Sequence, residues 1–308
     1  MLIDLAGGSH IGRKKDKNED SYGIFSEDMP EINLFKHGAL LVVADGLGGH
    51  IGGDIASKLA VSMVRDVLKR EAPPEDTAGS EREDSYYVSA LQEALTRANE
   101  SIYRTNRDLV KNGRPMGTTA TVALIRPKTV YVINVGDSRA YLFRKGAIVA
   151  QTRDHSWVEE QVAQGFMTQA EAERDKRKNL LTRSIGTHPE IESDAYQWHI
   201  EAGDQLLLCS DGLVNMVQDN QIRDILAQPA LAEDKVDKLI ALANEQGGKD
   251  NITAVLAVIN PGKRQLKQLK RQAWFEKNKA TFKRAVTLAF FALACYSLGV
   301  LSGYLISR

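Results

Sequence analysis

Cysteine and histidine are both scarce in this 308-residue sequence. The two cysteines are Cys209, which ends an apolar run that begins at Leu206, and Cys295, which lies in an uncharged segment near the C-terminus. A disulfide between two such positions is implausible, and unpaired cysteine is typical of a reducing compartment. The six histidines do not cluster, which argues against the histidine-rich metal motifs of many nucleotide phosphodiesterases.

The sequence also lacks an excess of charge, since 40 Lys and Arg residues balance 40 Asp and Glu residues. No basic stripe with interleaved aromatic residues occurs before about residue 260, so we expect no nucleic-acid binding. Residues 1–5 contain neither the basic segment nor the long apolar run of a secretory signal. With 43% hydrophobic and 26% charged residues, the composition is that of a globular protein.

Long hydrophobic runs are missing until the end of the sequence. Residues 285–306 form an uncharged run of roughly 22 residues, enough to cross about 30 Å of hydrocarbon as a helix. Apolar residues surround that helix instead of forming one stripe, which favours a membrane anchor over a core or docking helix. Because basic residues crowd positions 261–284 and only Arg308 follows, the chain is predicted to be single-pass in the cytoplasmic membrane, with residues 1–284 in the cytoplasm.

The domain boundaries follow from this change of composition. We expect a globular domain over residues 1–260, a basic juxtamembrane segment over 261–284 and a transmembrane helix over 285–306. The juxtamembrane segment could bind anionic lipid headgroups, or it could be a solvated helix.

Short apolar or β-branched runs bounded by Gly, Pro or Asp predict strands in the globular domain. They span residues 39–44, 119–125, 130–135, 140–143, 205–209 and 252–258. Helical spacing of apolar residues predicts helices over 54–70 and 86–111, with an exposed loop at 73–80 between them. Strands 130–135 and 140–143 are predicted to form an antiparallel hairpin, followed by a turn at 144–147. This order indicates a mixed α and β layered domain rather than a parallel βαβ series.

Three aspartates follow or precede such strands beside glycines. Asp45 is followed by three glycines within four positions, Asp211 by Gly212, and Asp250 follows Gly247-Gly248. One Asp-Gly pair alone is usually a turn. Three carboxylates at buried strand ends, however, would repel one another unless a cation or protons intervened. Oxygen ligands suit Mg²⁺ or Mn²⁺ and argue against zinc, and two such ions about 3.5 to 4 Å apart can activate a water for attack on phosphorus.

Eight motifs, in this order, resemble the PPM family of metal-dependent protein serine/threonine phosphatases, the type 2C phosphatases, in their bacterial form. They are Asn18-Glu19-Asp20-Ser21, Asp45-Gly46-Leu47-Gly48-Gly49-His50, Met116-Gly117-Thr118-Thr119-Ala120, Asn134-Val135-Gly136-Asp137-Ser138-Arg139-Ala140-Tyr141, Asp154-His155-Ser156, Leu181-Thr182-Arg183-Ser184-Ile185-Gly186, Ser210-Asp211-Gly212-Leu213 and Lys249-Asp250-Asn251-Ile252-Thr253. The resemblance covers about residues 7–259. It implies an α+β fold, a four-layer αββα sandwich of two antiparallel sheets flanked by helices, with the predicted transmembrane helix appended.

The resemblance also implies a binuclear Mn²⁺ or Mg²⁺ centre at one end of the sandwich. Asp45 would bridge both ions, the Gly46 carbonyl would bind one, and Asp211 and Asp250 would bind the other, which makes the three aspartates the catalytic residues. Two further aspartates would have lesser roles. Asp20 would act mainly through metal-bound water, and Asp137 would help Asp211 hold a weaker third ion.

The phosphate-binding residue is open between two candidates. The family's arginine position corresponds to Lys15, while Arg13 lies two residues earlier on the same loop. A lysine offers a point charge rather than the two-pronged fork of arginine. A histidine that eukaryotic relatives use as general acid is replaced by Leu47, so metal-bound water or another residue would protonate the leaving group. His50 and His155 are expected to be structural.

The predicted activity is hydrolysis of phosphoserine and phosphothreonine in proteins by a metal-activated water, without a phospho-enzyme. The family suggests that it reverses a bacterial Ser/Thr kinase, so the expected partners are that kinase and its substrates, with a monomeric catalytic domain. Two alternatives are a pseudophosphatase that only binds phosphoproteins and another metal-dependent phosphoester hydrolase. Residues 158–179 correspond to the family's flap beside the active site. Gly117-Thr118-Thr119 lacks the lysine and spacing of a phosphate loop and is expected to start a core strand.

Overall fold

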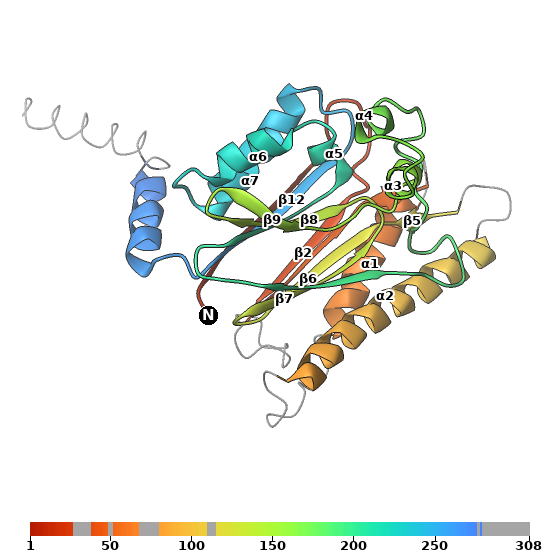
Figure 1. Ribbon diagram of the computed structural model, residues 1–308, viewed down its shortest axis with the longest axis horizontal. Helices are drawn as coiled ribbons and strands as arrows, with labels where there is room; N and C mark the ends of the chain where they lie inside the picture. Colours follow the sequence, from red (N-terminus) through yellow and green to blue (C-terminus); the bar gives the residue numbers. More distant parts are fainter. Residues whose placement is uncertain (27–37, 49–51, 68–79, 110–114, 276–277, 279–308) are drawn as a thin grey trace, which may run out of the picture. The chain divides into compact units, whose positions relative to one another are not determined.

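The computed structural model describes residues 1–26, 38–48, 52–67, 80–109, 115–275 and 278 (Figure 1). The chain divides into two compact units, Met1–Pro261 and Gly262–Arg308. The first unit carries the strands and most of the described helices, and the second is described separately below.

Two five-stranded antiparallel sheets form the centre of the first unit. The first sheet has the order β1-β12-β11-β8-β9, and the second has the order β10-β7-β6-β3-β2. The strands of the first sheet are β1 (Ile3–His10), β8 (Arg139–Arg144), β9 (Ala147–Gln151), β11 (Gln205–Cys209) and β12 (Ile252–Ile259). Those of the second are β2 (Ser21–Ser26), β3 (Ala39–Ala44), β6 (Ala120–Ile125), β7 (Thr129–Val135) and β10 (Asp194–His199). A short pair, β4 (Gly46–Leu47) with β5 (Gly117–Thr118), lies beside them.

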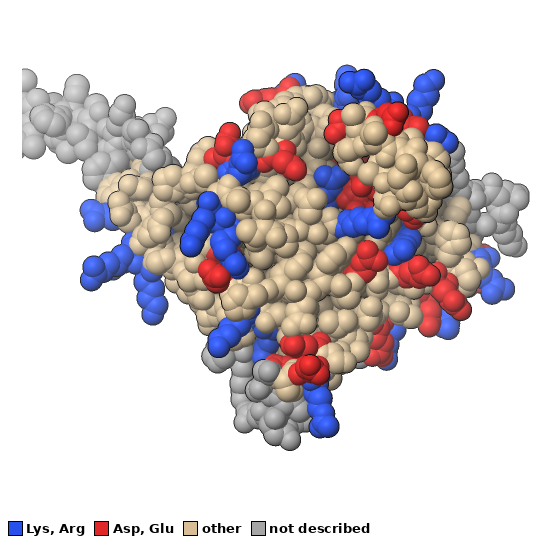
Figure 2. Space-filling view, viewed as in Figure 1, with Lys and Arg blue, Asp and Glu red and all other residues tan. Residues whose placement is uncertain are grey.

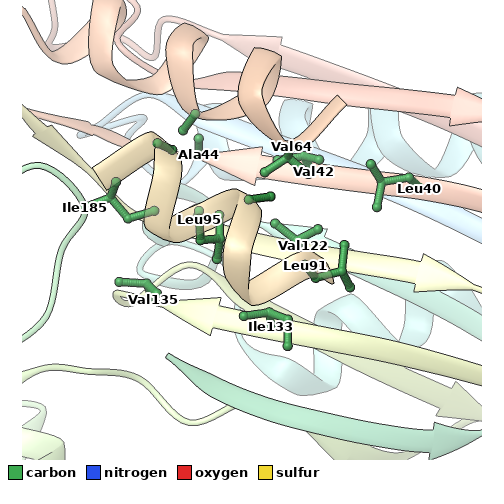
Figure 3. Packing of buried hydrophobic residues seen from close by; sticks show 14 of the residues in the cluster. Leu40, Val42, Ala44, Val64, Leu91, Leu95, Val122, Ile133, Val135 and Ile185 are labelled. Atoms are coloured by element: carbon green, nitrogen blue, oxygen red, sulfur yellow. The ribbon is translucent and has the colours of Figure 1, made fainter. Parts of the chain in front are cut away.

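Helices cover the outer face of each sheet, which gives four layers (Figure 1). Helices α1 (Gly53–Val67) and α2 (Glu81–Leu109) pack on the second sheet, and Figure 3 shows Leu91 and Leu95 of α2 facing Val122 and Ile133. Helices α6 (Asp219–Leu226) and α7 (Ala232–Glu245) pack on the first sheet. The inner faces of the two sheets share a third apolar cluster. Strands such as β3 are apolar at every position because both of their faces are buried.

Three short helices complete the described part of the first unit. They are α3 (Trp157–Ala163), α4 (Gln169–Ala172) and α5 (Asp211–Val214). Helix α3 is capped by the Ser156 hydroxyl, and α4 begins with a capping box in which Thr168 and Glu171 satisfy each other's backbone N–H groups. The predicted flap, residues 158–179, therefore contains most of α3 and all of α4.

The six predicted strands agree with the structure to within a residue or so, and both predicted helices are present, although their predicted ends at 70 and 111 lie outside the described residues. The predicted hairpin is wrong. Strand β7 pairs with β6 and β10 in one sheet, whereas β8 pairs with β9 and β11 in the other. Gly136 carries the chain between the sheets with a φ of +107°, a backbone conformation that favours glycine. Two strand patterns joined by a glycine-containing turn have the same sequence signal whether the strands pair as a hairpin or belong to different sheets. Strand β8 instead forms a hairpin with β9 through the predicted turn, where Lys145 and Gly146 both have positive φ.

The second unit is described over residues 262–275, of which 263–275 form a helix, and at Asn278. In the part of the chain that the structure describes, no helix is both long and apolar enough to cross a bilayer. The predicted transmembrane helix at 285–306 lies outside the described residues, as do His50 and nearly all of the predicted loop at 73–80.

Candidate metal centre

Strand pairing brings the aspartates of the sequence motifs to one end of the sandwich. Asp20 precedes β2 and Asp45 follows β3, and these strands pair Ser21 with Ala44. Asp211 follows β11 and Asp250 precedes β12, and these strands pair Cys209 with Ala254. Asp137 lies in the crossing between the sheets. The antiparallel registers thus gather five carboxylates that are up to 230 positions apart in the sequence (250 minus 20).

Asp45 and Asp211 lie close enough that the charge of one affects the ionisation of the other. Burial raises the pKa of Asp45 well above its ordinary value, and the charges of Asp20, Asp211, Asp137 and Asp250 raise it further. Burial, together with the charge of Asp250, raises the pKa of Asp211 to about 6. A cation bound by these carboxylates would offset both the desolvation and the repulsion.

Asp20 is oriented by two hydroxyl groups. Its Oδ2 accepts hydrogen bonds from Ser210 Oγ at 2.8 Å and from Thr253 Oγ1 at 2.6 Å. Its Oδ1 is buried and has no hydrogen-bond partner. Burial raises the pKa of Asp20 to about 7, with the hydroxyl hydrogen bonds acting in the opposite direction.

The turn at Asp45 is held by the motif that contains Thr118 and Thr119. The Asp45 carbonyl accepts from Thr119 N at 2.8 Å and from Thr118 Oγ1 at 2.9 Å, while Asp45 N donates to Thr119 Oγ1 at 3.0 Å. Thr118 ends β5, and Thr119 directly precedes the fully buried strand β6. The expectation that this motif starts a core strand is therefore confirmed. Gly46 has no room for a side chain, because a Cβ there would lie 2.3 Å from the Gly53 carbonyl oxygen.

Lys15, and not Arg13, is brought to the carboxylates. Lys15 Nζ lies 2.6 Å from Asp250 Oδ1. Burial lowers the pKa of Lys15, but the hydrogen bond and charge of Asp250 and the charges of Asp45 and Asp211 raise it overall. Arg13 donates its backbone N–H to the Gly248 carbonyl at 2.7 Å. The Arg13 side chain is exposed, and its Cγ lies close to Gly248.

A cleft of about 840 Å³ opens beside Asp137 and Asp211. The predicted flap forms one wall with α3 and α4, and the segment from α5 to the start of α6 forms the opposite wall. Basic and acidic residues both line it (Figure 2 shows one face of the molecule). On the wall near Asp137, the Arg139 guanidinium forms two hydrogen bonds with the Asp154 carboxylate, at 2.8 and 2.7 Å.

Comparison with known proteins agrees with this geometry. A sequence model described as "Protein phosphatase 2C" matches residues 6–257. The chain belongs to the protein phosphatase 2C family.

Relatives of this phosphatase 2C chain share most of its length. It is 35% identical over 249 residues to the serine/threonine phosphatase stp of Listeria monocytogenes, covering 80% of this chain and 91% of the relative. The solved serine/threonine phosphatase of S. agalactiae superposes with a TM-score of 0.73 at 32% identity, covering 84% of this chain and 100% of that chain. The catalytic domain of PstP, solved in complex with two manganese ions, gives a TM-score of 0.67 at 32% identity and covers 83% of this chain and 97% of that chain.

Metal dependence is a property of the phosphatase 2C family, and the residues of this chain fit a divalent cation. Across the described ranges, no three Asp, Glu, His or Cys side chains already close around a single point. The fit lies in unsatisfied oxygens: Asp20 Oδ1 and Asp211 Oδ1 are buried without hydrogen-bond partners. A buried carboxylate oxygen without a donor is costly unless a cation binds it.

One residue at this centre was given no role from the sequence. Glu19 Oε1 is buried without a hydrogen-bond partner, and it lies 2.8 Å from where a Cβ on Gly53 would be. Gly53 in turn adjoins Gly46, so Glu19 lies beside the Asp45-Gly46 turn. The sequence feature that could have indicated a role for Glu19 is its position next to Asp20 in a phosphatase 2C motif. His155 has the structural contact expected of it, because its Nδ1 accepts from Gly136 N at 3.2 Å.

Proposed function

We propose that this protein phosphatase 2C hydrolyses phosphoserine and phosphothreonine esters in proteins by direct attack of water, without a phospho-enzyme. The observation that carries the proposal is the group of carboxylates Asp20, Asp45 and Asp211, gathered beside a cleft in a chain whose relatives are named serine/threonine phosphatases. Retention of these carboxylates favours an enzyme over a module that only binds phosphoproteins.

The proposed metal ligands are those expected from the sequence. Asp45 would bridge two ions, the Gly46 carbonyl would bind one of them, and Asp211 and Asp250 would bind the other. Asp20 would act from the outer shell, and Asp137 would share a weaker third ion with Asp211. When bound, Mn²⁺ or Mg²⁺ supplies positive charge for the phosphoryl oxygens and lowers the pKa of a water molecule.

The protein's own groups position these parts. The hydroxyls of Ser210 and Thr253 fix the Asp20 carboxylate, and the Thr118-Thr119 backbone fixes Asp45. Lys15 is the proposed phosphate-binding residue, because its ammonium group already lies among carboxylates at the cleft end of the sandwich. It would exchange its contact with Asp250 for a phosphate oxygen and attract the dianionic ester as a point charge.

The activity is tested by following phosphate release from a phosphothreonine peptide with Mn²⁺ present. We expect turnover in the unaltered chain, loss of turnover in excess EDTA, and at least a hundredfold lower kcat in Asp211→Asn. Asp234→Asn is the matched control, since Asp234 is exposed on α7 and should leave kcat unchanged. Undiminished turnover by Asp211→Asn, or turnover that resists EDTA, contradicts the proposal.

The proposal for location is a phosphatase domain over residues 1–260 in the cytoplasm, a juxtamembrane segment over 261–284 and an anchor over 285–306 in the cytoplasmic membrane. Its support is the uncharged run and its basic N-terminal flank. A membrane-associated Ser/Thr kinase and its substrates are the proposed partners. Deleting residues 263–308 should move the protein from the membrane to the soluble fraction of a cell extract, and continued membrane association would contradict the anchor.

A further inference from the structure

The helix at residues 263–275 carries charge of one sign only. It contains five cations, Lys263, Arg264, Lys267, Lys270 and Arg271, and no acidic residue. Basic side chains also protrude from this segment in Figure 2. Because the chain as a whole has equal numbers of acidic and basic residues, this segment is a local departure from a neutral protein.

The cations share one face of the helix with two aromatic residues. At 3.6 residues per turn, the five cations, Trp274 and Phe275 fall within an arc of about 140°. The remaining arc contains glutamines and a stripe of apolar residues, Leu266, Leu269 and Ala273, spaced at i, i+3 and i+7. The helix is therefore amphipathic, with cations and aromatic rings opposite aliphatic side chains.

Burial follows the same division. Leu266 is only 7% exposed, and Leu269 and Ala273 are half-buried. Every cation on the opposite face is exposed, and so are Trp274, at 56%, and Phe275, at 45%. The aliphatic stripe is thus less exposed than the face that combines positive charge with large aromatic rings.

The two aromatic rings are arranged as a unit. Trp274 and Phe275 meet edge to face with their centroids 5.1 Å apart, and the Arg271 guanidinium lies 5.6 Å from the Phe275 ring centroid. Exposed Trp beside Lys and Arg is the composition of a membrane interface, where rings enter the headgroup layer and cations contact lipid phosphates.

We propose that the exposed face of residues 263–275 binds the surface of an anionic bilayer, through the cations and the Trp274-Phe275 pair. This contact is separate from the phosphatase activity and from the anchor proposed at 285–306. A nucleic acid would also match the positive charge, but the exposed aromatic pair at one end of a cationic helix face fits a lipid interface better than a phosphate backbone alone.

The test uses a chain that ends at residue 278, so that the uncharged run is absent. Such a chain is expected to fold, because the first unit has its own apolar cores and the S. agalactiae phosphatase is matched over its full length by 84% of this chain. Sedimentation would be measured with vesicles of phosphatidylcholine alone and of phosphatidylcholine mixed with phosphatidylglycerol. Binding is expected only to the mixed vesicles, and added salt should weaken it.

Variants divide the contributions of charge and aromatic rings. Lys267→Gln/Arg271→Gln should lower partitioning into mixed vesicles by roughly 25-fold, at about fivefold per cation. Trp274→Ala/Phe275→Ala should also lower it severalfold, although no charge is lost. Arg223→Gln/Lys238→Gln is the matched control, because it removes two exposed cations from α6 and α7 and should leave partitioning within about twofold.

Three outcomes would overturn the proposal: equal binding to both kinds of vesicle, partitioning unchanged in both helix variants, or binding to duplex DNA with none to vesicles. Phosphatase activity of each variant is measured in parallel and should not change. Absence of vesicle binding with normal turnover would contradict only the bilayer proposal. Absence of turnover with normal vesicle binding would contradict only the proposed activity.

Discussion

The ammonium group of Lys15 lies 2.6 Å from the Asp250 carboxylate, within the group of acids gathered at one end of the sandwich. Asp250, Asp45 and Asp211 all raise the pKa of Lys15, against the opposing effect of its burial. One lysine therefore provides local positive charge beside carboxylates that are proposed to bind metal ions. Lys15 would then have two competing interactions, with a carboxylate in the resting protein and with the phosphate of the substrate.

Removing the charge of Lys15 should separate substrate binding from metal binding. Lys15→Gln is expected to lower kcat/KM for a phosphothreonine peptide by about 10- to 100-fold, the range for losing one charge-assisted hydrogen bond. The same change should tighten or preserve Mn²⁺ affinity, because no ammonium group then competes for Asp250. Both quantities are obtained from initial rates at varied peptide and Mn²⁺ concentrations.

Neighbouring substitutions serve as controls for Lys15. Lys14→Gln and Arg13→Gln remove the same charge from exposed positions on the same loop and should change kcat/KM by less than about threefold. Lys15→Arg should retain activity, since guanidinium also binds phosphate. A larger loss in Arg13→Gln than in Lys15→Gln would assign phosphate binding to Arg13 instead.

Thr253 is expected to affect metal affinity without contacting the metal. Its Oγ1 donates to Asp20 Oδ2 at 2.6 Å, and the side chain is fully buried. Thr253→Val keeps the shape but removes this hydrogen bond, so the Mn²⁺ concentration for half-maximal activity should rise about tenfold, while kcat at saturating Mn²⁺ changes little. Thr105→Val removes a threonine hydrogen bond in α2 and should leave the Mn²⁺ dependence unchanged. An unchanged Mn²⁺ dependence in Thr253→Val would show that the Thr253 hydrogen bond is not needed to position Asp20 for metal binding.

Gly136 should be far less tolerant of a side chain than another glycine with positive φ. A Cβ at Gly136 would lie 2.5 Å from Thr119 Cγ2, whereas a Cβ at Gly146 would meet nothing within 4 Å. Gly146→Ala is expected to cost about 1 kcal/mol of unfolding free energy, from its backbone conformation alone. Gly136→Ala should cost at least about 3 kcal/mol, because it adds a clash beside the residues that hold Asp45. Urea denaturation measures both, and equal costs would contradict the proposed close packing.

Sequence patterns predicted the parts of this fold that depend on local chemistry. Strand β11 was predicted with its observed ends, since an apolar run bounded by polar residues is a local signal. The partners of β7 and β8 could not be predicted in this way, because a turn at Gly136 has the same sequence signals whether the chain reverses within a sheet or crosses between sheets. The order of the motifs indicated the carboxylate group, but it could not show that Lys15 pairs with Asp250 while Arg13 donates its backbone N–H to Gly248, because both contacts depend on the folded chain.

The buried amine of Lys235 should make stability increase with pH in the mildly alkaline range. Lys235 is 5% exposed, and its Nζ donates to Gln205 Oε1 at 2.9 Å and to the Leu226 carbonyl at 2.8 Å, both uncharged acceptors. Burial lowers its pKa from 10.5 to about 8 in the folded protein, although the charge of Asp4 acts in the opposite direction. Below pH 8 both states carry the charge, so the cost of burying it is present in full.

Between about pH 8 and 10.5 the unfolded chain binds a proton at Lys235 that the folded chain has released, so the free energy of unfolding rises with pH. Lys235→Met should remove this rise. At pH 7 it should be more stable than the unaltered protein by on the order of 2 kcal/mol, because no charge is buried and the Leu226 carbonyl still accepts from Gln205. Urea denaturation at pH 7 and pH 9.5 gives the difference between the two proteins, in which contributions from other titrating groups cancel. Lys238→Met, on the exposed face of α7, is the control, and its free energy of unfolding should change with pH as that of the unaltered protein does. If Lys235→Met shows the same pH dependence as the unaltered protein, the amine is not buried in its charged form.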